Sequence, residues 1–405
     1  MSFRTTISYL LFPLTMWYAV GVAVRNVLYA VGLKKQVAPH ITTIGVGNLS
    51  TGGSGKTPHV EYLLRLLADK YPTAVLSRGY KRKSRGFVLD DGSHDPAQLG
   101  DEPAMMAAKF PQVQFAVCEN RIEGVKRLIN AGCEAPDTED AAAETETTAT
   151  TPTSELRTPN SELSQSPTSE LPTPNSELKN SPELIILDDV FQHRHITPNI
   201  NILLTEYRHP YYKDRILPYG NLREFRSGRS RAGIVIVTKC PDRLKPIERH
   251  NIVHDLSLQN YQKVFFSYLK YGTPRTLDGT PADLDLRHLD GVLVVTGIAH
   301  PEPLLDELRR TCKVHHLAFP DHHNFSKGDI ARIHSAFDAI QGSRKLIITT
   351  EKDSVRLRGL TGDLPVYFIP IEVAFHEETD ADFDHTIEST VRENISFLNK
   401  LSIWS

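Results

Sequence analysis

The sequence has few cysteines and almost no net charge, and each of these properties argues against certain classes of protein. Its 4 cysteines lie far apart in a chain of 405 residues and include no Cys-x-x-Cys pair. This spacing argues against a zinc site or a disulfide framework, and free thiols fit a reducing compartment such as the cytoplasm. The formal net charge of -3 gives no indication of nucleic-acid binding. A chain of this length favours two domains.

Charged residues are absent from Ile7 to Val24, a run that is marginally short for a helix spanning a bilayer. Pro13 interrupts the run, its tyrosines and tryptophan favour a membrane interface, and basic residues flank it. We therefore predict a membrane-associated helix within residues 1–35. A helix buried in the core stays open as an alternative, as does a secretory signal with a small-x-small site at Gly21-Val22-Ala23. The signal is disfavoured because a loop typical of ATP binding follows at once.

Residues 134–182 are rich in Thr, Ser, Pro, Glu and Asn, and they contain an internal repeat. PTSELRTPNSEL at position 152 returns as PTSELPTPNSEL at position 167, a period too short for a solenoid. Apolar side chains are too few here to offset the entropy of ordering. We predict a disordered acidic insertion in a surface loop.

Around this insertion, β-branched apolar runs alternate with helical patterns, which indicates an α/β fold with a mostly parallel sheet covered by helices on both faces. The predicted strands cover residues 40–47, 73–77, 113–117, 183–189, 200–205 and 233–239, and then 291–298, 314–319, 345–350 and 364–369. We expect a larger domain over 36–263, a linker over 264–285 and a smaller α/β domain over 286–405. A cleft between them is the natural place for chemistry.

The stretch GNLSTGGSGKTP, residues 47–58, lies between a predicted strand and a predicted helix. It is similar to the phosphate-binding pattern Gly-x4-Gly-Lys-Ser/Thr, except that Ser50 replaces the first Gly. Its glycines let backbone N–H groups surround an anion at a helix N-terminus. The residues predicted to bind ATP are Thr51, Gly52, Gly53, Ser54, Gly55, Lys56 and Thr57. Lys56 would reach the β- and γ-phosphates and Thr57 would offer its hydroxyl to Mg²⁺, so the larger domain is predicted to be P-loop NTPase-like.

A phosphate loop works with an acidic residue after another hydrophobic strand, and the run ELIILDD supplies Asp188 and Asp189. One of them would hold Mg²⁺ directly or through water. A GTPase would carry Asn-Lys-x-Asp, a spacing that VTKCPD at 237–242 lacks. A nucleotide-driven switch without a lipid acceptor and a non-catalytic nucleotide-binding scaffold stay open as alternatives.

Seven motifs occur in this order along the chain: GNLSTGGSGKTP, SRGYKRKSRG, GDEP, LDDVFQHR, ILPYGNLRE, FPDHH and TTEKD. Together they resemble tetraacyldisaccharide 4′-kinase, the lipid A 4′-kinase family of Gram-negative bacteria, over nearly the whole chain outside the insertion. Val190 departs from the family, which usually has Gly after the paired aspartates. The resemblance implies transfer of the ATP γ-phosphate to the 4′-hydroxyl of a lipid A disaccharide 1-phosphate, giving lipid IV-A. It also implies a place at the cytoplasmic face of the inner membrane and no obligate protein partner.

The same resemblance implies a catalytic pair. Asp101 in GDEP would accept the hydroxyl proton, and His322 in FPDHH would hold or tune that carboxylate once the cleft closes. Glu102 and Glu224 are candidates to join Thr57, Asp188 and Asp189 around Mg²⁺. The residues predicted to grip the disaccharide or its phosphate are Arg78, Tyr80, Arg121, Asn221 and Arg223. The basic segment around Arg78 would meet anionic head groups, or it is simply a solvated loop.

Overall fold

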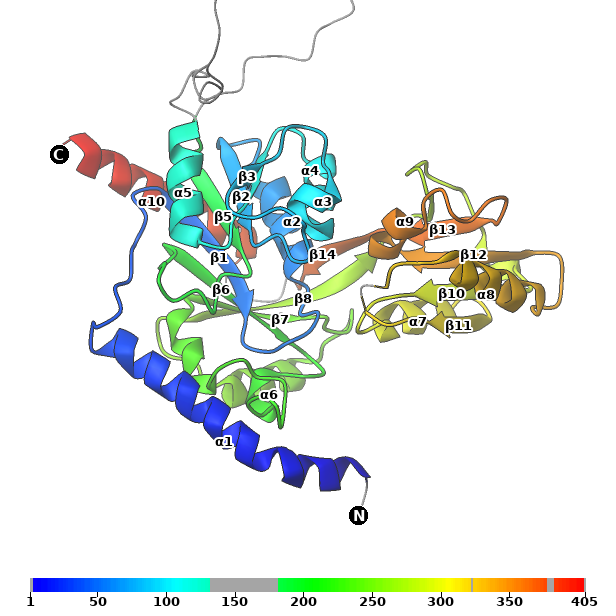
Figure 1. Cartoon of the computed structure of the whole chain (residues 1–405), viewed down its shortest axis with the longest axis horizontal. Helices are drawn as coiled ribbons and strands as arrows, with labels where there is room; N and C mark the ends of the chain where they lie inside the picture. The colour runs from blue at the N-terminus through cyan, green and yellow to red at the C-terminus, as the bar shows by residue number, and fades with distance from the viewer. Residues whose placement is uncertain (1–2, 132–180, 322, 377–381, 404–405) are drawn as a thin grey trace, which may run out of the picture.

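The structure of the protein is a computed structural model that describes residues 3–131, 181–321, 323–376 and 382–403. Two α/β domains each form around one sheet, and helix α1 (Phe3–Ala30) runs along the outside of the larger domain (Figure 1). The predicted mixed α/β architecture with large, mostly parallel sheets is confirmed. The predicted insertion at 134–182 lies outside the described residues except for its last two.

The larger sheet has nine strands in the order β14-β8-β7-β6-β1-β5-β2-β4-β3. They are β1 (Thr42–Asn48), β2 (Thr73–Ser77), β3 (Val88–Leu89), β4 (Gln114–Val117), β5 (Leu184–Asp188), β6 (Ile200–Glu206), β7 (Ile234–Thr238), β8 (Lys263–Tyr271) and β14 (Ile371–Phe375). Neighbouring strands are parallel except in the pairs β3–β4 and β14–β8. Because β1 is central, the loop that follows it opens at the middle of the carboxyl edge, where open α/β sheets bind ligands.

Helices cover this sheet on both faces. They are α2 (Lys56–Leu67), α3 (Pro96–Leu99), α4 (Asp101–Lys109), α5 (Arg121–Ala131), α6 (Pro246–Leu256) and α10 (Phe383–Ile403), with short 3₁₀ turns η1 (Tyr211–Lys213) and η2 (Arg226–Arg231). Helix α2 buries Val60, Leu63, Leu64 and Leu67 against the sheet, so the side of the helix that faces the core is apolar. The N-terminus of α2 is thereby fixed at the end of β1.

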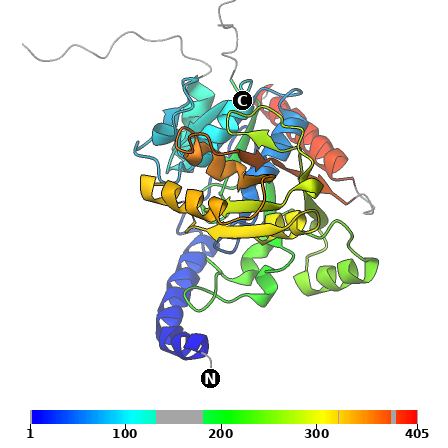
Figure 2. The same cartoon turned by 90° about the vertical axis from the view of Figure 1, so that its right-hand side faces the viewer.

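The smaller domain, which faces the viewer in Figure 2, has a five-stranded sheet in the order β11-β10-β12-β13-β9. Its elements are β9 (Arg275–Thr276), η3 (Leu286–His288), β10 (Gly291–Thr296), α7 (Glu302–Arg309), β11 (Val314–Ala318), α8 (Lys327–Asp338), β12 (Lys345–Thr350), α9 (Glu351–Leu357) and β13 (Val366–Ile369). Only β9 is antiparallel to its neighbour. Short α9 directly follows the central strand β12, and it faces the larger domain.

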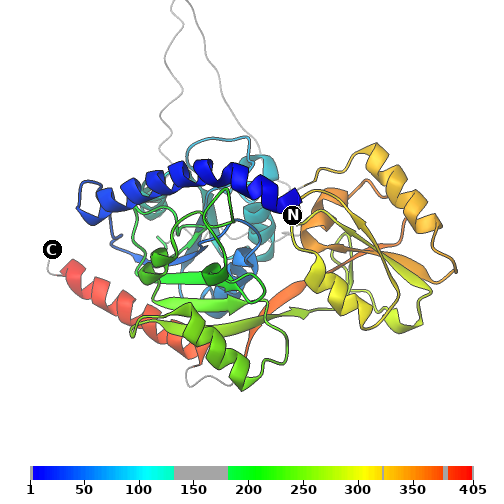
Figure 3. The same cartoon turned by 90° about the horizontal axis from the view of Figure 1, so that it is seen from below.

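The strands β8 and β14 connect the two domains, and they correct the predicted boundaries. The predicted linker at 264–285 begins inside β8, while the predicted second domain includes β14 and α10, which return to the larger domain (Figure 3). The reason is aromatic packing: the rings of Phe375 and Phe383 stack with centroids 4.0 Å apart and join the core around α2. Hydrophobic periodicity shows that α10 has an apolar face but not which sheet covers it.

From Pro13 onward, α1 turns apolar side chains to solvent. Trp17 is 78% exposed, and Val20, Val24 and Val27 follow it on one face at 52%, 53% and 56%. The alternative of a helix buried in the core is therefore wrong for this part of α1. None of the helices in the described ranges has a stretch apolar enough, over sufficient length, to cross a bilayer.

Candidate nucleotide and catalytic site

The phosphate loop starts as an extension of a strand, which explains why Ser50 can replace glycine. Ser50 forms an antiparallel bridge with Leu222, and the Thr51 N–H donates to the Asn221 carbonyl at 2.7 Å. The left-handed backbone positions come later, at Gly52 (φ 109°) and Gly55 (φ 85°), where glycine avoids the Cβ clash. The missing first glycine is thus not needed, because the chain is still extended at residue 50.

The two side chains that end the loop each meet a carboxylate. Lys56 Nζ lies 3.5 Å from Asp189 Oδ1, and the Thr57 hydroxyl donates to Glu102 Oε2 at 2.6 Å. Asp189 takes a left-handed backbone conformation (φ 48°) just after β5, and this turns its side chain toward the loop. Burial raises the pKa of Asp189, but Lys56 and Arg223 outweigh it, and the net pKa is lowered.

Asp188 is buried beside these groups and keeps one oxygen unpaired. The Ser77 hydroxyl donates to its Oδ2 at 3.1 Å, whereas its Oδ1 has no hydrogen-bond partner among the residues that the structure describes. Burial, with help from Glu102 and Asp189, raises the pKa of Asp188 to about 6. A buried, unpaired carboxylate oxygen next to a second carboxylate needs a cation to be stable.

Lys352 of the smaller domain completes the cluster, although no prediction included it. Its ammonium pairs with Glu102 Oε1, so Glu102 bridges the Thr57 hydroxyl and a cation from the other domain. Burial raises the pKa of Glu102, but Lys352, Thr57 and Lys56 together lower it to about 2. The sequence signal was the motif TTEKD, in which Lys352 is the only cation.

The arrangement fits ATP and Mg²⁺. Besides Asp188 Oδ1, the Asn48 side-chain amide and the Ser54 hydroxyl around the loop are buried, and neither has a hydrogen-bond partner within the described part of the chain. Such orphaned groups are costly unless a ligand or water satisfies them. Within the described residues, no three His, Cys, Asp or Glu side chains converge as a metal cage. That suits Mg²⁺, which takes one or two carboxylates plus substrate phosphates.

Two predicted site residues are fully buried and bonded to the framework of the larger domain. Glu224 is fully buried, and its two oxygens accept from Arg231 at 2.8 and 2.9 Å. Arg121 is also fully buried, and it donates to the carbonyls of Cys118 and Asp188, the latter at 3.0 Å. Glu224 is thus neutralised by the half-buried Arg231, and Arg121 braces the end of β5, while a role of Glu224 at the metal and of Arg121 at the substrate stays a prediction.

The other predicted substrate contacts lie at the surface of the same region. Arg223 donates to Asp189 Oδ2 at 3.2 Å and to Gln192 at 3.1 Å, so it is already tied to the loop's carboxylate. Asn221 is exposed and holds the phosphate loop through its backbone. Arg78 is exposed, as is Tyr80 at 65%. All four can meet a ligand that lies over the carboxyl edge.

The structure describes one member of the predicted catalytic pair, Asp101. Asp101 begins α4 with its side chain 48% exposed, and Arg356 of the smaller domain donates to its Oδ2 at 3.0 Å. His322 lies outside the described residues, so its contact with Asp101 stays a prediction. The described neighbour His323 pairs with Asp329 at 3.0 Å and stacks on Phe319.

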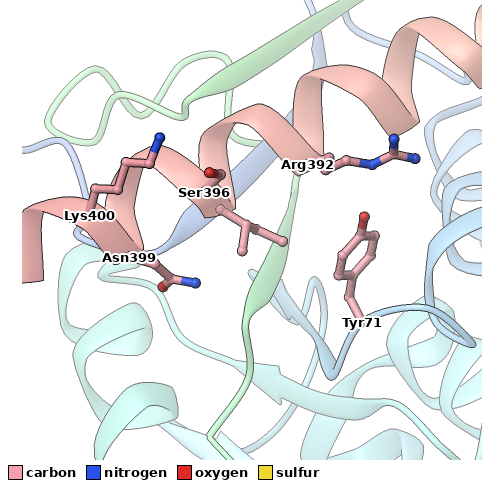
Figure 4. A pocket seen from close by; sticks show the side chains of 6 residues that line it. Tyr71, Arg392, Ser396, Asn399 and Lys400 are labelled. Carbon is pink, nitrogen blue, oxygen red and sulfur yellow. The ribbon is translucent and has the colours of Figure 1, made fainter.

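A separate cavity of about 390 Å³ lies between α10 and Tyr71 (Figure 4). Arg392, Ser396, Asn399 and Lys400 of α10 line it, together with the apolar Ile395. None of the predicted site residues lines this cavity, so it does not belong to the nucleotide site.

Comparison with known proteins decides the family. Residues 7–392 match the family described as tetraacyldisaccharide-1-P 4′-kinase. The chain belongs to this family. Curated proteins named tetraacyldisaccharide 4′-kinase are similar to it: one from Bacteroides thetaiotaomicron is 39% identical over 95% of this chain and 93% of that protein. Another, from Flavobacterium johnsoniae, is 37% identical over 95% of this chain and 98% of that protein.

A solved tetraacyldisaccharide 4′-kinase family structure has the same overall fold. It is the "apo" form of LpxK from Aquifex aeolicus in complex with ATP, 26% identical, with a TM-score of 0.64. The alignment covers 96% of this chain and 99% of that one. The family predicted from the motifs is confirmed, and with it the prediction of an ATP-dependent kinase.

Proposed function

We propose that this protein transfers the γ-phosphate of ATP to the 4′-hydroxyl of a tetraacyldisaccharide 1-phosphate, the step that yields lipid IV-A in lipid A biosynthesis. The observation that carries this proposal is the phosphate loop itself, in a chain of the 4′-kinase family. Lys56 and Thr57 end a glycine-rich loop at a helix N-terminus, and each contacts a carboxylate, Asp189 and Glu102. A nucleotide switch without an acceptor would not belong to this family.

Residues 51–57 hold the phosphates of ATP. Backbone N–H groups of the loop and the N-terminus of α2 attract the anion, and Lys56 neutralises its charge. The buried Ser54 hydroxyl has no partner among the described residues, and it would gain one from a bound nucleotide. The loop keeps its shape because the Thr238 hydroxyl donates to the Ser54 carbonyl at 3.0 Å.

Thr57, Asp188 and Glu102 are the residues that would hold Mg²⁺, with Asp189 behind them. The metal, when bound, neutralises charge on the phosphate oxygens as the phosphoryl group moves. Asp188 is fixed for this role by Ser77, and Arg121 holds its backbone carbonyl. Glu102 already contacts the Thr57 hydroxyl, so these two groups would hold Mg²⁺ together.

Asp101 is the group on this chain that accepts the proton of the 4′-hydroxyl. A sugar hydroxyl is a weak nucleophile, so a carboxylate within reach lowers the barrier to its attack. Arg356 orients this carboxylate from the smaller domain, as His322 is predicted to do. Asp101 and Glu102 are adjacent in the first turn of α4, so this turn positions both the proposed base and the proposed metal ligand.

The lipid acceptor reaches the site from the side of α1. The Tyr18 hydroxyl of α1 donates to the Arg223 carbonyl at 2.8 Å, which ties the helix to the loop that pairs with Asp189. Exposed apolar side chains on α1 enter the membrane surface, and the exposed Lys34 and Lys35 meet anionic lipid head groups. Arg78, Tyr80, Asn221 and Arg223 then contact the disaccharide or its phosphate. The enzyme works at the cytoplasmic face of the inner membrane.

A label-transfer assay tests this function. Purified protein with Mg²⁺ and ATP labelled at the γ-phosphate should label a tetraacyldisaccharide 1-phosphate in mixed micelles. Lys56→Met should abolish transfer, while Lys70→Met, which removes a half-exposed lysine paired with Glu388, should leave it unchanged. Absence of transfer by wild-type protein that binds ATP would overturn the proposal.

The role of Asp101 has its own test. Asp101→Asn should lower turnover by about 10²- to 10⁴-fold, the usual contribution of a general base, while ATP affinity stays close to wild type. ATP affinity is measured by calorimetry and turnover by label transfer. Loss of ATP binding with unchanged turnover per bound nucleotide would show that Asp101 is not the base.

A further inference from the structure

Three ion pairs join α4 of the larger domain to α9 of the smaller one. Asp101 pairs with Arg356 at 3.0 Å, Glu102 pairs with Lys352, and Lys109 pairs with Glu351 at 2.8 Å. The two members of each pair come from different domains, so these contacts exist only while the domains are together. Helix α4 also carries the proposed base and a proposed metal ligand, so two of these three ion pairs involve the proposed catalytic groups.

Lys352 differs from the other residues of these three ion pairs, because its partner Glu102 also contacts the phosphate loop. Glu102 accepts the Lys352 ammonium on Oε1 and the Thr57 hydroxyl on Oε2 at 2.6 Å. Only one carboxylate therefore separates this ammonium from the phosphate loop. Lys109 instead pairs with Glu61, at 3.0 Å, and with Glu351, neither of which contacts the loop.

The smaller domain holds Lys352 on a rigid base. The next residue, Asp353, is fully buried and accepts from the Gly297 N–H at 2.9 Å and from the Thr350 hydroxyl at 2.7 Å. Thr350 in turn caps α9 through the Asp353 N–H at 3.2 Å. These bonds link the ends of β10 and β12, so the backbone of Lys352 is fixed. Its side chain extends from the smaller domain to Glu102 of the larger one.

We propose that Lys352 is a catalytic residue that contacts the terminal phosphate of ATP from the smaller domain. This inference rests on the proposed function. In the structure, Lys352 neutralises Glu102. With Mg²⁺ and ATP bound, Glu102 would help to hold the metal, and the Lys352 ammonium would then contact the γ-phosphate and add positive charge there, as cations do in other phosphoryl transfers. Catalysis would then require that the two domains meet.

The chemistry balances without any proton from Lys352. The 4′-oxygen forms a bond to the γ-phosphorus, and the bond between that phosphorus and the β–γ bridging oxygen breaks. ADP leaves with the electron pair, and the hydroxyl proton passes to Asp101. Lys352 stays protonated throughout and supplies charge and hydrogen bonds.

Lys352→Met and Lys109→Met are a matched pair for the test, because both remove a lysine from a cross-domain ion pair on the same helix pair. Their side chains are exposed to a similar degree, 34% and 27%. Full-length Lys352→Met should lower kcat for label transfer by about 100-fold, as loss of one preorganised transition-state donor does. Lys109→Met should stay within a few-fold of wild type, and Lys352→Arg should recover part of the loss.

Nucleotide affinity gives a second readout that needs no lipid acceptor. Lys352→Met should weaken ATP binding by roughly tenfold or more relative to ADP binding, because ADP lacks the phosphate that the ammonium contacts. Equal weakening of ATP binding and ADP binding would show that Lys352 only holds the two domains together, and would overturn the proposal. An equal loss of kcat in Lys352→Met and Lys109→Met would do the same. If Lys352→Met does not fold, Lys352→Gln carries the same comparison.

The two proposals fail separately. Wild-type protein that binds ATP but labels no disaccharide refutes the proposed function, whatever Lys352 does. Wild-type protein that transfers label at the same rate as Lys352→Met leaves the function intact and refutes the role of Lys352.

Discussion

The Thr57 hydroxyl and the Glu102 carboxylate are joined by a hydrogen bond of 2.6 Å, which links the phosphate loop to α4. Glu102 also pairs with Lys352, so one carboxylate connects the loop, the helix that carries Asp101 and the smaller domain. A change at Glu102 should therefore disturb metal binding and domain contact together.

Glu102→Gln is expected to lower kcat by about 10- to 100-fold and to raise the Mg²⁺ concentration needed for half-maximal rate. The amide is a weaker magnesium ligand than the carboxylate and cannot form an ion pair with Lys352. Label transfer measured over a Mg²⁺ titration checks this. Glu61→Gln, a change at a buried carboxylate paired with Lys109, is the control and should leave the Mg²⁺ requirement unchanged. An unchanged requirement in Glu102→Gln would remove this residue from the metal site.

Gly47→Ala should lower the free energy of unfolding by roughly 1–3 kcal/mol, the usual range for overpacking a core. A Cβ at Gly47 would lie 2.5 Å from Phe191 Cβ and 2.9 Å from the Phe191 backbone nitrogen, and neither atom is the end of a flexible side chain. Gly233→Ala, whose added Cβ meets nothing within 4 Å, is the control. Chemical denaturation of both variants measures the difference, and equal stabilities would show that β1 can move away from residue 191.

The strands and the loop were predictable because each depends on local sequence. The run ELIILDD could only be a buried strand with carboxylates at its end, and β5 with Asp188 and Asp189 is what the structure has. Gly55-Lys56-Thr57 likewise marks the start of α2. Such features follow from side-chain periodicity and backbone preference over a few residues.

Contacts between distant segments were not predictable in this way. Nothing local distinguishes Glu224, which is neutralised by Arg231, from Glu102, which reaches Thr57. Both are single glutamates in polar motifs, and only the fold shows that Glu224 is the one buried beside an arginine. The return of α10 to the larger domain and the position of Lys352 depend on tertiary packing in the same way.

Stability should fall as the pH falls from 7 to 5, because His59 is buried as a neutral ring. It contacts the Gly55 carbonyl at 2.7 Å and the Ser267 hydroxyl at 2.9 Å. Burial, reinforced by Lys239, lowers the pKa of His59 to about 4, from 6.5 in the unfolded chain. Between these two pKa values the unfolded state binds more protons than the folded state. The free energy of unfolding therefore decreases as the pH falls from about 6.5 toward 4.

The expected loss from His59 is roughly 2 kcal/mol between pH 7 and pH 5. Denaturant titrations at the two pH values measure it. His59→Gln should reduce the slope, to which His193, whose pKa burial also lowers to about 4, still contributes. His254→Gln, at a ring with a side chain 85% exposed, should keep the wild-type slope. A wild-type slope in His59→Gln would assign the pH dependence to other groups.

Deleting residues 140–180 should leave label transfer and stability close to wild type. The described residues on either side of this segment are already in contact, since the Ser181 hydroxyl donates to the Ile129 carbonyl at 3.2 Å. The remaining residues are enough to connect α5 to β5 without strain at the site, because closing a surface loop depends only weakly on its length. Turnover and the thermal midpoint check this. A folded but inactive deletion variant would give the segment a functional role.

Replacing Trp17, Val20 and Val24 by Ser should weaken binding to vesicles of anionic phospholipid by more than tenfold. These side chains form one exposed apolar face of α1, and each buries apolar area when the helix enters the membrane surface, at roughly 25 cal/mol per Å². Phe397→Ser with Leu401→Ser removes comparably exposed apolar side chains from α10 and should leave vesicle binding unchanged. Turnover on a short-chain, water-soluble disaccharide separates anchoring from catalysis: the α1 variant should keep it, because Tyr18 still holds the Arg223 carbonyl. Equal loss of vesicle binding in both variants would show that α1 is not the membrane contact.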